Sequence, residues 1–218
     1  MWAIAPGAYA QLGVEAGYDF LHGKGTLAAG EEGHFSGATR NHGFRVGLTY
    51  DFTIKGNLGL HTGVLYSYAA GNVWETDRSL QSFSVYGTMQ VRSVYQQLEV
   101  PIRVRYDLPV TNDFKFFVFG GPVLGYTLSG QVKDWSFRSS SVSLQGTTTY
   151  PRTCPYNVYE RYGLMPFELK LGAGLGVHYK HYVLKFSYDW GLLDQYTRGT
   201  ASDKVHHNQL NVSVGYVF

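Results

Sequence analysis

The chain has 218 residues, enough for one all-β domain or two small domains, and only 16% of them are charged, against about 25% in an ordinary soluble domain. Aromatic residues make up 16% and glycine contributes 27 residues. The net charge of +2 is uninformative about nucleic acid, but the chain has no basic run, and no nucleic-acid partner is expected. No run approaches the roughly 18 consecutive apolar residues of a spanning helix, and a single cysteine, Cys154, excludes an internal disulfide.

The first ten residues, MWAIAPGAYA, are mildly apolar and end in Ala8-Tyr9-Ala10. Small residues two positions apart are typical of the end of a signal peptide. The basic start and a full apolar stretch are missing, so residues 1–10 are either a signal-peptide remnant or an ordinary N-terminal segment. Residues 11–218 form the predicted folded domain.

Eight segments with alternating apolar and polar residues follow, and a period of two is typical of strands with two different faces. In chain order they lie at about 11–20, 42–53, 57–68, 94–107, 114–129, 166–179, 181–191 and 207–218. The fourth segment changes its apolar frame, so we expect this strand to extend toward the N-terminal side with a β-bulge near Tyr95–Gln97.

The connections between these segments alternate in length. Three are of hairpin size, at Lys55–Asn57, Leu108–Asp113 and Lys180–His181. Four are long, at about 21–41, 69–93, 130–165 and 192–206. This alternation predicts an antiparallel up-and-down sheet with its short turns at one end and its long loops at the other.

Eight alternating strands fit two closed architectures, which differ in the face that meets water. A soluble lipocalin-like barrel is apolar inside, whereas a membrane barrel is apolar outside. The polar face of this chain is dense in glycine rather than in long charged side chains, with Gly13, Gly17, Gly47, Gly59, Gly63, Gly121, Gly125, Gly172, Gly174, Gly176 and Gly215. Such a face suits a narrow and tightly curved lumen.

The charges of the polar face also balance. Six cations stand against six anions: Arg45, Arg103, Arg105, Lys115, Lys170 and Lys185, and Glu15, Asp19, Asp51, Glu99, Glu168 and Asp189. Buried charges must be paired, or each costs several kcal/mol. We therefore predict a charge-plugged lumen, closed further by Phe117 and Phe119; a proton or solute relay is the functional alternative.

The other face has Leu and Val in mid-strand and Tyr, Phe and Trp toward the strand ends. This is the pattern of a lipid-facing band between aromatic girdles, and strands of about 10–12 residues at a tilt of about 45° match a hydrocarbon core. The predicted fold is all-β, an eight-stranded antiparallel up-and-down transmembrane β-barrel. The predicted location is the bacterial outer membrane, with periplasmic termini.

The closing segment, LNVSVGYVF, ends on an outward row with Val214, Tyr216 and Phe218. It resembles the C-terminal assembly signal of bacterial outer-membrane barrels. The predicted partners are therefore outer-membrane lipid and the barrel assembly machinery.

Three stretches resemble the PorT-like small outer-membrane β-barrel family of Bacteroidota: YQQLEVPIRVRY (95–106), FFVFGGPVLGYTL (116–128) and LGAGLGVHYKHYVLKFSYDWGLLD (171–194). The resemblance implies the fold and the compartment. PorT itself is tied to type IX secretion, although the three stretches do not single this chain out as PorT.

We expect a non-catalytic membrane anchor and interaction module, as an accessory subunit of a larger outer-membrane complex such as a secretion system. The alternatives are a small-solute or lipid-handling barrel and an enzyme at the barrel rim. Asp189 with His178, and Ser67 with His61, share inward faces, but neither pair shows an order of nucleophile, base and orienting group. No cofactor or metal site is expected.

A protein partner would bind the predicted loops, whose aromatic residues are of the types found at binding hot spots. The candidates are Trp74, Trp135, Tyr150, Tyr156 and Tyr159. Packing of the loops on themselves and against the outer leaflet is the alternative interpretation.

Overall fold

The computed structural model describes residues 10–28, 34–76, 85–141, 146–152, 156–157, 159–160, 164–193 and 204–218. The strands are β1 (Ala10–Ala28), β2 (His34–Lys55), β3 (Leu58–Thr76), β4 (Val85–Pro109), β5 (Phe114–Ser141), β6 (Gly146–Arg152), β7 (Tyr156–Asn157), β8 (Phe167–Tyr179), β9 (Tyr182–Gly191) and β10 (Lys204–Val217). No helix in the described residues is long and apolar enough to cross a membrane.

Eight of these strands close into a barrel in which every neighbouring pair is antiparallel. Their order is β4-β3-β2-β1-β10-β9-β8-β5, and pairing of β4 with β5 closes the ring. The remaining two strands, β6 and β7, pair with β5 beyond the ring. Closure is what a membrane requires, since lipid cannot satisfy the backbone of a free strand edge. The predicted fold is thereby confirmed.

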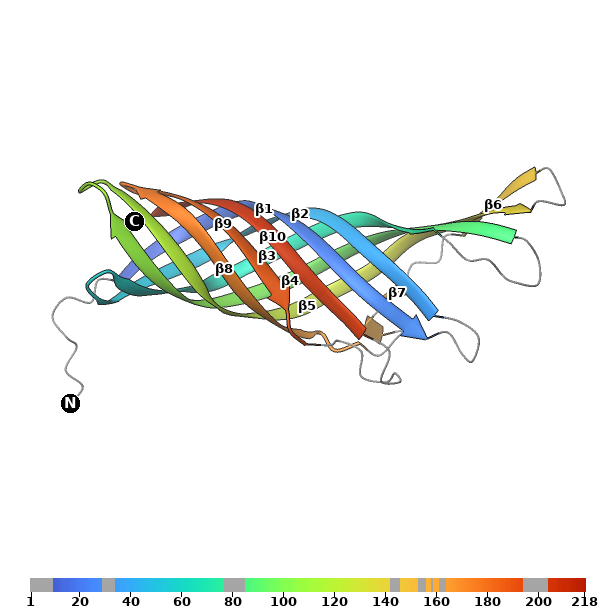
Figure 1. The fold of residues 1–218 in the computed structure, drawn as a ribbon, viewed down its shortest axis with the longest axis horizontal. Helices are drawn as coiled ribbons and strands as arrows, with labels where there is room; N and C mark the ends of the chain where they lie inside the picture. The colour runs from blue at the N-terminus through green and yellow to red at the C-terminus, as the bar shows by residue number, and fades with distance from the viewer. Residues whose placement is uncertain are drawn as a thin grey trace.

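The short turns gather at one end of the barrel, together with the C-terminus (Figure 1). We call this the short-turn end and the opposite one the loop end. Two of the turns need a left-handed backbone, at Gly56 with φ 56° and at Lys180 with φ 55°. The first suits glycine, which has no Cβ to clash, whereas the second places a lysine where L-residues are uncommon.

The strand ends differ from the prediction in one direction. At the short-turn end they agree within one or two residues, but at the loop end β1 to β5 continue well past the expected bounds. Much of the predicted loops at 21–41, 69–93 and 130–165 is therefore strand. β4, β5 and β6 reach furthest and form a sheet extension beyond the barrel (Figure 1).

The predicted extension of the fourth strand is confirmed, and a register shift lies where the bulge was expected, but the extra residue stands on β5 rather than on β4. The register between β4 and β5 shifts at Gln96/Gln97 and again at Arg92/Ser93. Each shift adds one residue to β5, Leu128 at the first and Lys133 at the second, whereas β4 stays in continuous register with β3 through this segment. Strands β6 and β7 were not predicted, because their residues show no long alternation.

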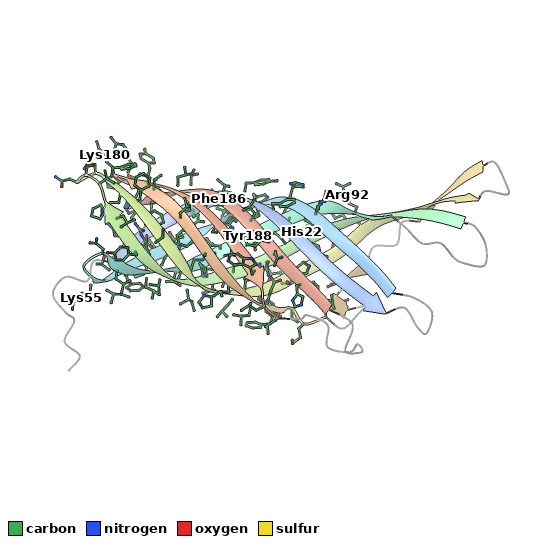
Figure 2. All side chains as sticks on the ribbon, viewed as in Figure 1. His22, Lys55, Arg92, Lys180, Phe186 and Tyr188 are labelled. Atoms are coloured by element: carbon green, nitrogen blue, oxygen red, sulfur yellow. The ribbon has the colours of Figure 1, made fainter. Side chains whose placement is uncertain are left out.

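The outer face of the barrel is a continuous apolar belt. Leu184 and Phe186 on β9 are 48% and 46% exposed, whereas Lys185 between them and Ser187 after them are buried. Figure 2 shows the side chains of this strand around Phe186 and Tyr188. Aromatic residues border the belt at both ends, with Tyr18, Phe44, Tyr126, Phe167 and Trp190 toward the loop end and Phe52, Tyr106, Phe116, Tyr179, Tyr182 and Phe218 toward the short-turn end. A belt of this extent is a lipid-facing surface rather than a water-facing one.

Candidate functional site: the charged lumen

The inward frame of each strand carries the twelve charged residues that the alternation selects. Ten of them are buried, including Asp19, Lys170 and Asp189 at 0% exposure. The other two, Asp51 and Lys115, are partly exposed near the short-turn end. Because successive side chains of a strand point to opposite faces, the same frame that places apolar residues in lipid places these charges in the lumen.

The largest network lies in the loop-end half of the lumen. Arg45 donates from Nε to Asp19 and from Nη2 to Glu99, each at 2.8 Å. Lys170 then donates to the other oxygen of Glu99 at 2.8 Å and lies 3.0 Å from Glu168. Ser67, Gln97, His207 and Gln209 complete its hydrogen bonds.

This loop-end network joins strands that are not neighbours in the sheet. It runs from β1 and β2 to β4, β8 and β10, with Ser67 of β3 bonded to Asp19. Buried ion pairs add little net stability compared with apolar packing, but losing one partner leaves a charge that is expensive to bury. The network therefore fixes the distances across the lumen and resists opening of the barrel.

A second pair crosses the middle of the lumen. Arg103 of β4 donates to Asp189 of β9 at 2.6 Å, and Asn211 donates to the other carboxylate oxygen of Asp189 at 3.1 Å. Arg103 also lies over the Phe119 ring, with its guanidinium carbon 5.0 Å from the ring centroid. Cation–π contact of this kind stabilises an arginine away from water.

A third network lies toward the short-turn end. Lys185 pairs with Glu15 and lies 3.1 Å from His61 Nε2, while His61 Nδ1 lies 2.5 Å from Asp51. Arg105 bridges Asp51 at 3.1 Å and Asp107 at 2.5 Å. A carboxylate, an imidazole and an ammonium in sequence could pass a proton over a short distance.

Two aromatic residues fill the space between these layers. The side chains of Phe117 and Phe119 are 2% and 6% exposed and form the aromatic plug, where Arg105 lies 4.0 Å above the Phe117 ring centroid. A void next to the plug has a volume of about 10 Å³, the lower limit for one water molecule. The inward residues of the neighbouring strand are glycines there: a Cβ on Gly176 would lie 2.4 Å from the Phe117 ring.

Several further lumen residues follow the same alternation, but the twelve charged residues predicted for the lumen do not include them. Gln97, Gln209 and Asn211 share the inward frame of predicted residues and bond directly to them. His61 does the same on β3. The predicted set contained only charged residues, so these neutral residues were not included. Their inward position in the alternation of each strand is the signal that could have identified them.

The two residue pairs considered for rim catalysis are kept apart. Ser67 donates to Asp19 and His61 contacts Asp51, and the two residues lie six positions apart on one strand, about 20 Å. Asp189 lies opposite Gly172, six positions from His178 on β8. In the described part of the chain, neither pair forms a nucleophile–base contact.

Four of the five predicted partner-binding residues lie on strands rather than in loops. Trp74 lies on β3, Trp135 on β5, Tyr150 on β6 and Tyr156 on β7, and their side chains lie outside the described part. Tyr159 is half-buried, and its hydroxyl donates to Thr127 of β5 at 3.1 Å. Burial raises the pKa of this hydroxyl, and the contact with Thr127 turns it toward the barrel.

The closing strand places its outward row as the alternation predicts. Val214, Tyr216 and Phe218 are 59%, 36% and 66% exposed on the outer face. The Phe218 amide donates to the Leu12 carbonyl at 2.9 Å, which ties the last residue to the first strand. Cys154 lies outside the described residues. Among those that are described, no group of three or more His, Cys, Asp or Glu is placed to hold a metal ion.

Comparison with known proteins gives a family and a set of distant structural neighbours. No curated protein sequence matches the chain. Ail of Yersinia pestis, 15% identical, aligns over 96% of this chain and 99% of its own with a TM-score of 0.34. The Neisserial surface protein A is 13% identical over 96% and 99% with a TM-score of 0.40. A major outer membrane protein of Thermus thermophilus is 13% identical over 96% and 100% with a TM-score of 0.43.

The family match is the stronger finding. The profile described as outer membrane protein beta-barrel domain matches residues 5–196, most of the chain. It agrees with the closed antiparallel barrel, the apolar belt and the charged lumen. The chain therefore belongs to the outer membrane protein beta-barrel domain family and is an outer-membrane protein.

Proposed function

We propose that this protein is a non-catalytic outer-membrane barrel that serves as a membrane anchor and interaction module. The observation that carries the proposal is the cross-braced lumen, where buried charges pair with one another across the barrel. A solute pathway needs charges that face water and remain available to the solute. Here the charges pair with one another and hold the strands together, so we assign the charged lumen a structural role.

The interaction part of the proposal concerns the sheet extension formed by β4, β5 and β6. It continues the barrel wall beyond the loop end, with Val85 of β4 still paired with Ser141 of β5. A partner surface built on paired strands loses less conformational entropy on binding than a surface built on free loops. We propose that this extension docks another protein and that the barrel is an accessory subunit of a larger outer-membrane complex, such as a secretion system.

The proposed orientation places the short-turn end and the C-terminus in the periplasm. Outer-membrane barrels combine short periplasmic turns with longer extracellular connections, and the two ends of this barrel differ in that way. The outward row ending at Phe218 is then exposed on the side where the barrel assembly machinery would recognise it.

The finer placement in the PorT-like group of Bacteroidota is part of the same proposal. Its support is the three sequence stretches at 95–106, 116–128 and 171–194. They coincide with the strands β4, β5, β8 and β9, which contribute Glu99, Arg103, Lys170 and Asp189 to the lumen.

Purification of a tagged copy from native outer membranes in mild detergent tests the accessory role. A companion present in stoichiometric amount, and lost when β6 is removed by a Gly146–Arg152 deletion, is the expected result. Recovery of the barrel by itself from cross-linked as well as untreated membranes would refute the accessory role.

Single-channel recording in planar bilayers tests the plugged lumen separately. The folded barrel should give no stable conductance, because ion pairs and the aromatic plug occupy its interior. A steady open level in the wild-type protein would refute the plugged lumen and favour the small-solute alternative. Folding is checked beforehand by the difference in gel mobility between unboiled and boiled samples.

A further inference from the structure

The short-turn end of the lumen contains a pocket that the ion-pair networks do not fill. Its volume is about 240 Å³, far above the roughly 10–15 Å³ that one water molecule needs. It is lined by residues of β1, β2, β3, β4, β5 and β8, and its ionisable side chains are Asp51, Arg105, Asp107, Lys115 and His178. Beyond Arg105 the aromatic plug closes the lumen, so the pocket is blind.

Lys115 gives this pocket a cation without a counter-ion. It is the one member of the twelve lumen charges with no ion pair among the described residues, while the other five cations each contact at least one carboxylate. The side chain is only partly exposed and lines the pocket. An ammonium in this position keeps its three donors for water or for a ligand.

His178 adds a buried polar group on the neighbouring strand. Lys115 and His178 are register partners on β5 and β8, so their side chains project into the pocket side by side. The residue is 8% exposed, and neither ring nitrogen has a hydrogen-bond partner of acceptable geometry in the described part, although the Lys180 backbone lies nearby. A buried polar group without a partner is rare and points to a ligand or an ordered water.

Arg105 supplies the third group. It donates from Nε to Asp107 and from Nη1 to Asp51, which uses two of the five N–H donors of a guanidinium. Arg105, Lys115 and His178 all line the pocket, and they come from three strands, β4, β5 and β8. The two acids of the wall, Asp51 and Asp107, are both bound by Arg105, so Lys115 keeps a charge that no carboxylate of the pocket contacts.

We propose that this pocket binds a small phosphate-type oxyanion. Lys115 neutralises its charge, the free N–H groups of Arg105 donate from the floor, and His178, whose ring nitrogens are closed to solvent in this structure, turns its ring to donate one hydrogen bond. Donors that converge from three strands suit the several acceptor oxygens of a phosphate better than the two of a carboxylate. A free phosphate or a phosphorylated headgroup fragment offers the same chemistry, and the blind floor limits the occupant to a small group.

Calorimetric titration tests the proposal with the full chain folded in an uncharged maltoside detergent. Inorganic phosphate is the first probe, glycerol 1-phosphate represents a lipid headgroup, and acetate is the carboxylate control. The variants are Lys115→Gln and His178→Phe. The matched control is Lys55→Gln, because Lys55 lies at the same end of the barrel but outside the pocket lining (Figure 2).

The expected result is saturable binding of phosphate that weakens at least tenfold in Lys115→Gln and at least threefold in His178→Phe. Lys55→Gln should bind within twofold of the wild type, and acetate should bind at least fivefold more weakly than phosphate. Tighter binding of glycerol 1-phosphate than of phosphate would assign the site to headgroups, and the reverse order to free phosphate.

Three results would overturn the proposal, provided that every variant keeps the heat-dependent gel shift of a folded barrel. The first is the absence of saturable phosphate binding up to tens of millimolar. The second is an equal loss in Lys55→Gln, which would reduce the effect to net charge. The third is acetate binding as tightly as phosphate, which would remove the phosphate assignment.

Discussion

Replacement of Lys170 by methionine is the sharpest test of the idea that paired charges hold the lumen together. Lys170 is fully buried and touches Glu99 at 2.8 Å and Glu168 at 3.0 Å. Methionine has nearly the same length but no charge, so the substitution removes the cation without opening a large void. Two carboxylates then face each other across the site that Lys170 occupied.

The size of the loss follows from what each carboxylate keeps. Removing one partner of a buried ion pair costs about 3–5 kcal/mol. Glu99 keeps Arg45 at 2.8 Å, and Glu168 keeps Gln97 at 2.5 Å and His207 at 3.3 Å. We therefore expect Lys170→Met to lower the free energy of unfolding by about 3 kcal/mol, the low end of that range.

A double variant separates the lost charge from lost packing. In Lys170→Met with Glu168→Gln, the uncompensated carboxylate is also neutralised, and Glu99 remains paired with Arg45. The double variant should be more stable than the sum of the two single variants predicts, by about 1–2 kcal/mol of coupling. The exposed Lys55→Met serves as the control and should stay within about 0.5 kcal/mol of the wild type.

The assay is equilibrium unfolding by guanidinium chloride in lipid vesicles, followed by tryptophan fluorescence and by the gel shift between folded and unfolded protein. A loss below about 1 kcal/mol in Lys170→Met would show that water reaches the network. Strict additivity in the double variant would show that Glu168 and Lys170 act independently. Either result would refute a lumen closed by paired charges.

Three further predictions concern the outer face, the glycine lining and the closing strand. Val104→Lys, in the middle of the apolar belt, should cost about 2–4 kcal/mol in the same unfolding assay, whereas Val110→Lys in the β4–β5 turn should cost almost nothing; equal costs would contradict the lipid-facing belt. Gly176→Ala should destabilise the barrel by about 1–3 kcal/mol, because its Cβ would lie 2.4 Å from the Phe117 ring of the neighbouring strand. A Cβ on Gly120 meets nothing closer than 3.4 Å, so the control Gly120→Ala should stay within about 0.5 kcal/mol of the wild type. Phe218→Ala should lower the amount of barrel inserted in cells, measured by quantitative blotting of outer membranes, but leave refolding into vesicles unchanged; a defect in refolding as well would assign Phe218 a packing role instead.

The barrel and its lumen were predictable because the two-residue alternation indicates both the strands and the face that each side chain occupies. Alternation placed Lys185 and Ser187 inside and Leu184 and Phe186 in lipid, and a shift by one residue would have exchanged every side chain. The glycine-rich polar face then decided which side is the lumen. Alternation is independent of the length of the connections, so the predicted strand pairing was correct even where the predicted strand ends were not.

Pair partners inside the lumen were not predictable from alternation. The frame shows that Arg103 and Asp189 both point inward, but it does not show that strands β4 and β9 face each other at that height, because this depends on the stagger of the closed barrel. Lys115 illustrates the consequence, since a count of six cations and six anions suggests complete pairing although Arg105 contacts two acids and Lys115 none among the described residues. Equal numbers of cations and anions fix the net charge of the lumen but do not show which cation pairs with which anion.

The sheet extension shows why alternation also underestimates strand length. The fourth strand was expected to extend, but β5 was expected to end near residue 129, because its continuation holds polar residues at successive positions, as at Ser139 and Ser140, and resembles a loop in sequence. The hydrogen-bond ladder can continue without an apolar face, because it is formed by backbone groups that are present in every residue pair. In β4 and β5 the two register shifts carry the ladder beyond the belt to Val85 and Ser141. The sheet extension that we propose as the docking surface is thus a continuation of the barrel wall, and one of its strands, β4, is anchored inside the lumen by Glu99 and Arg103.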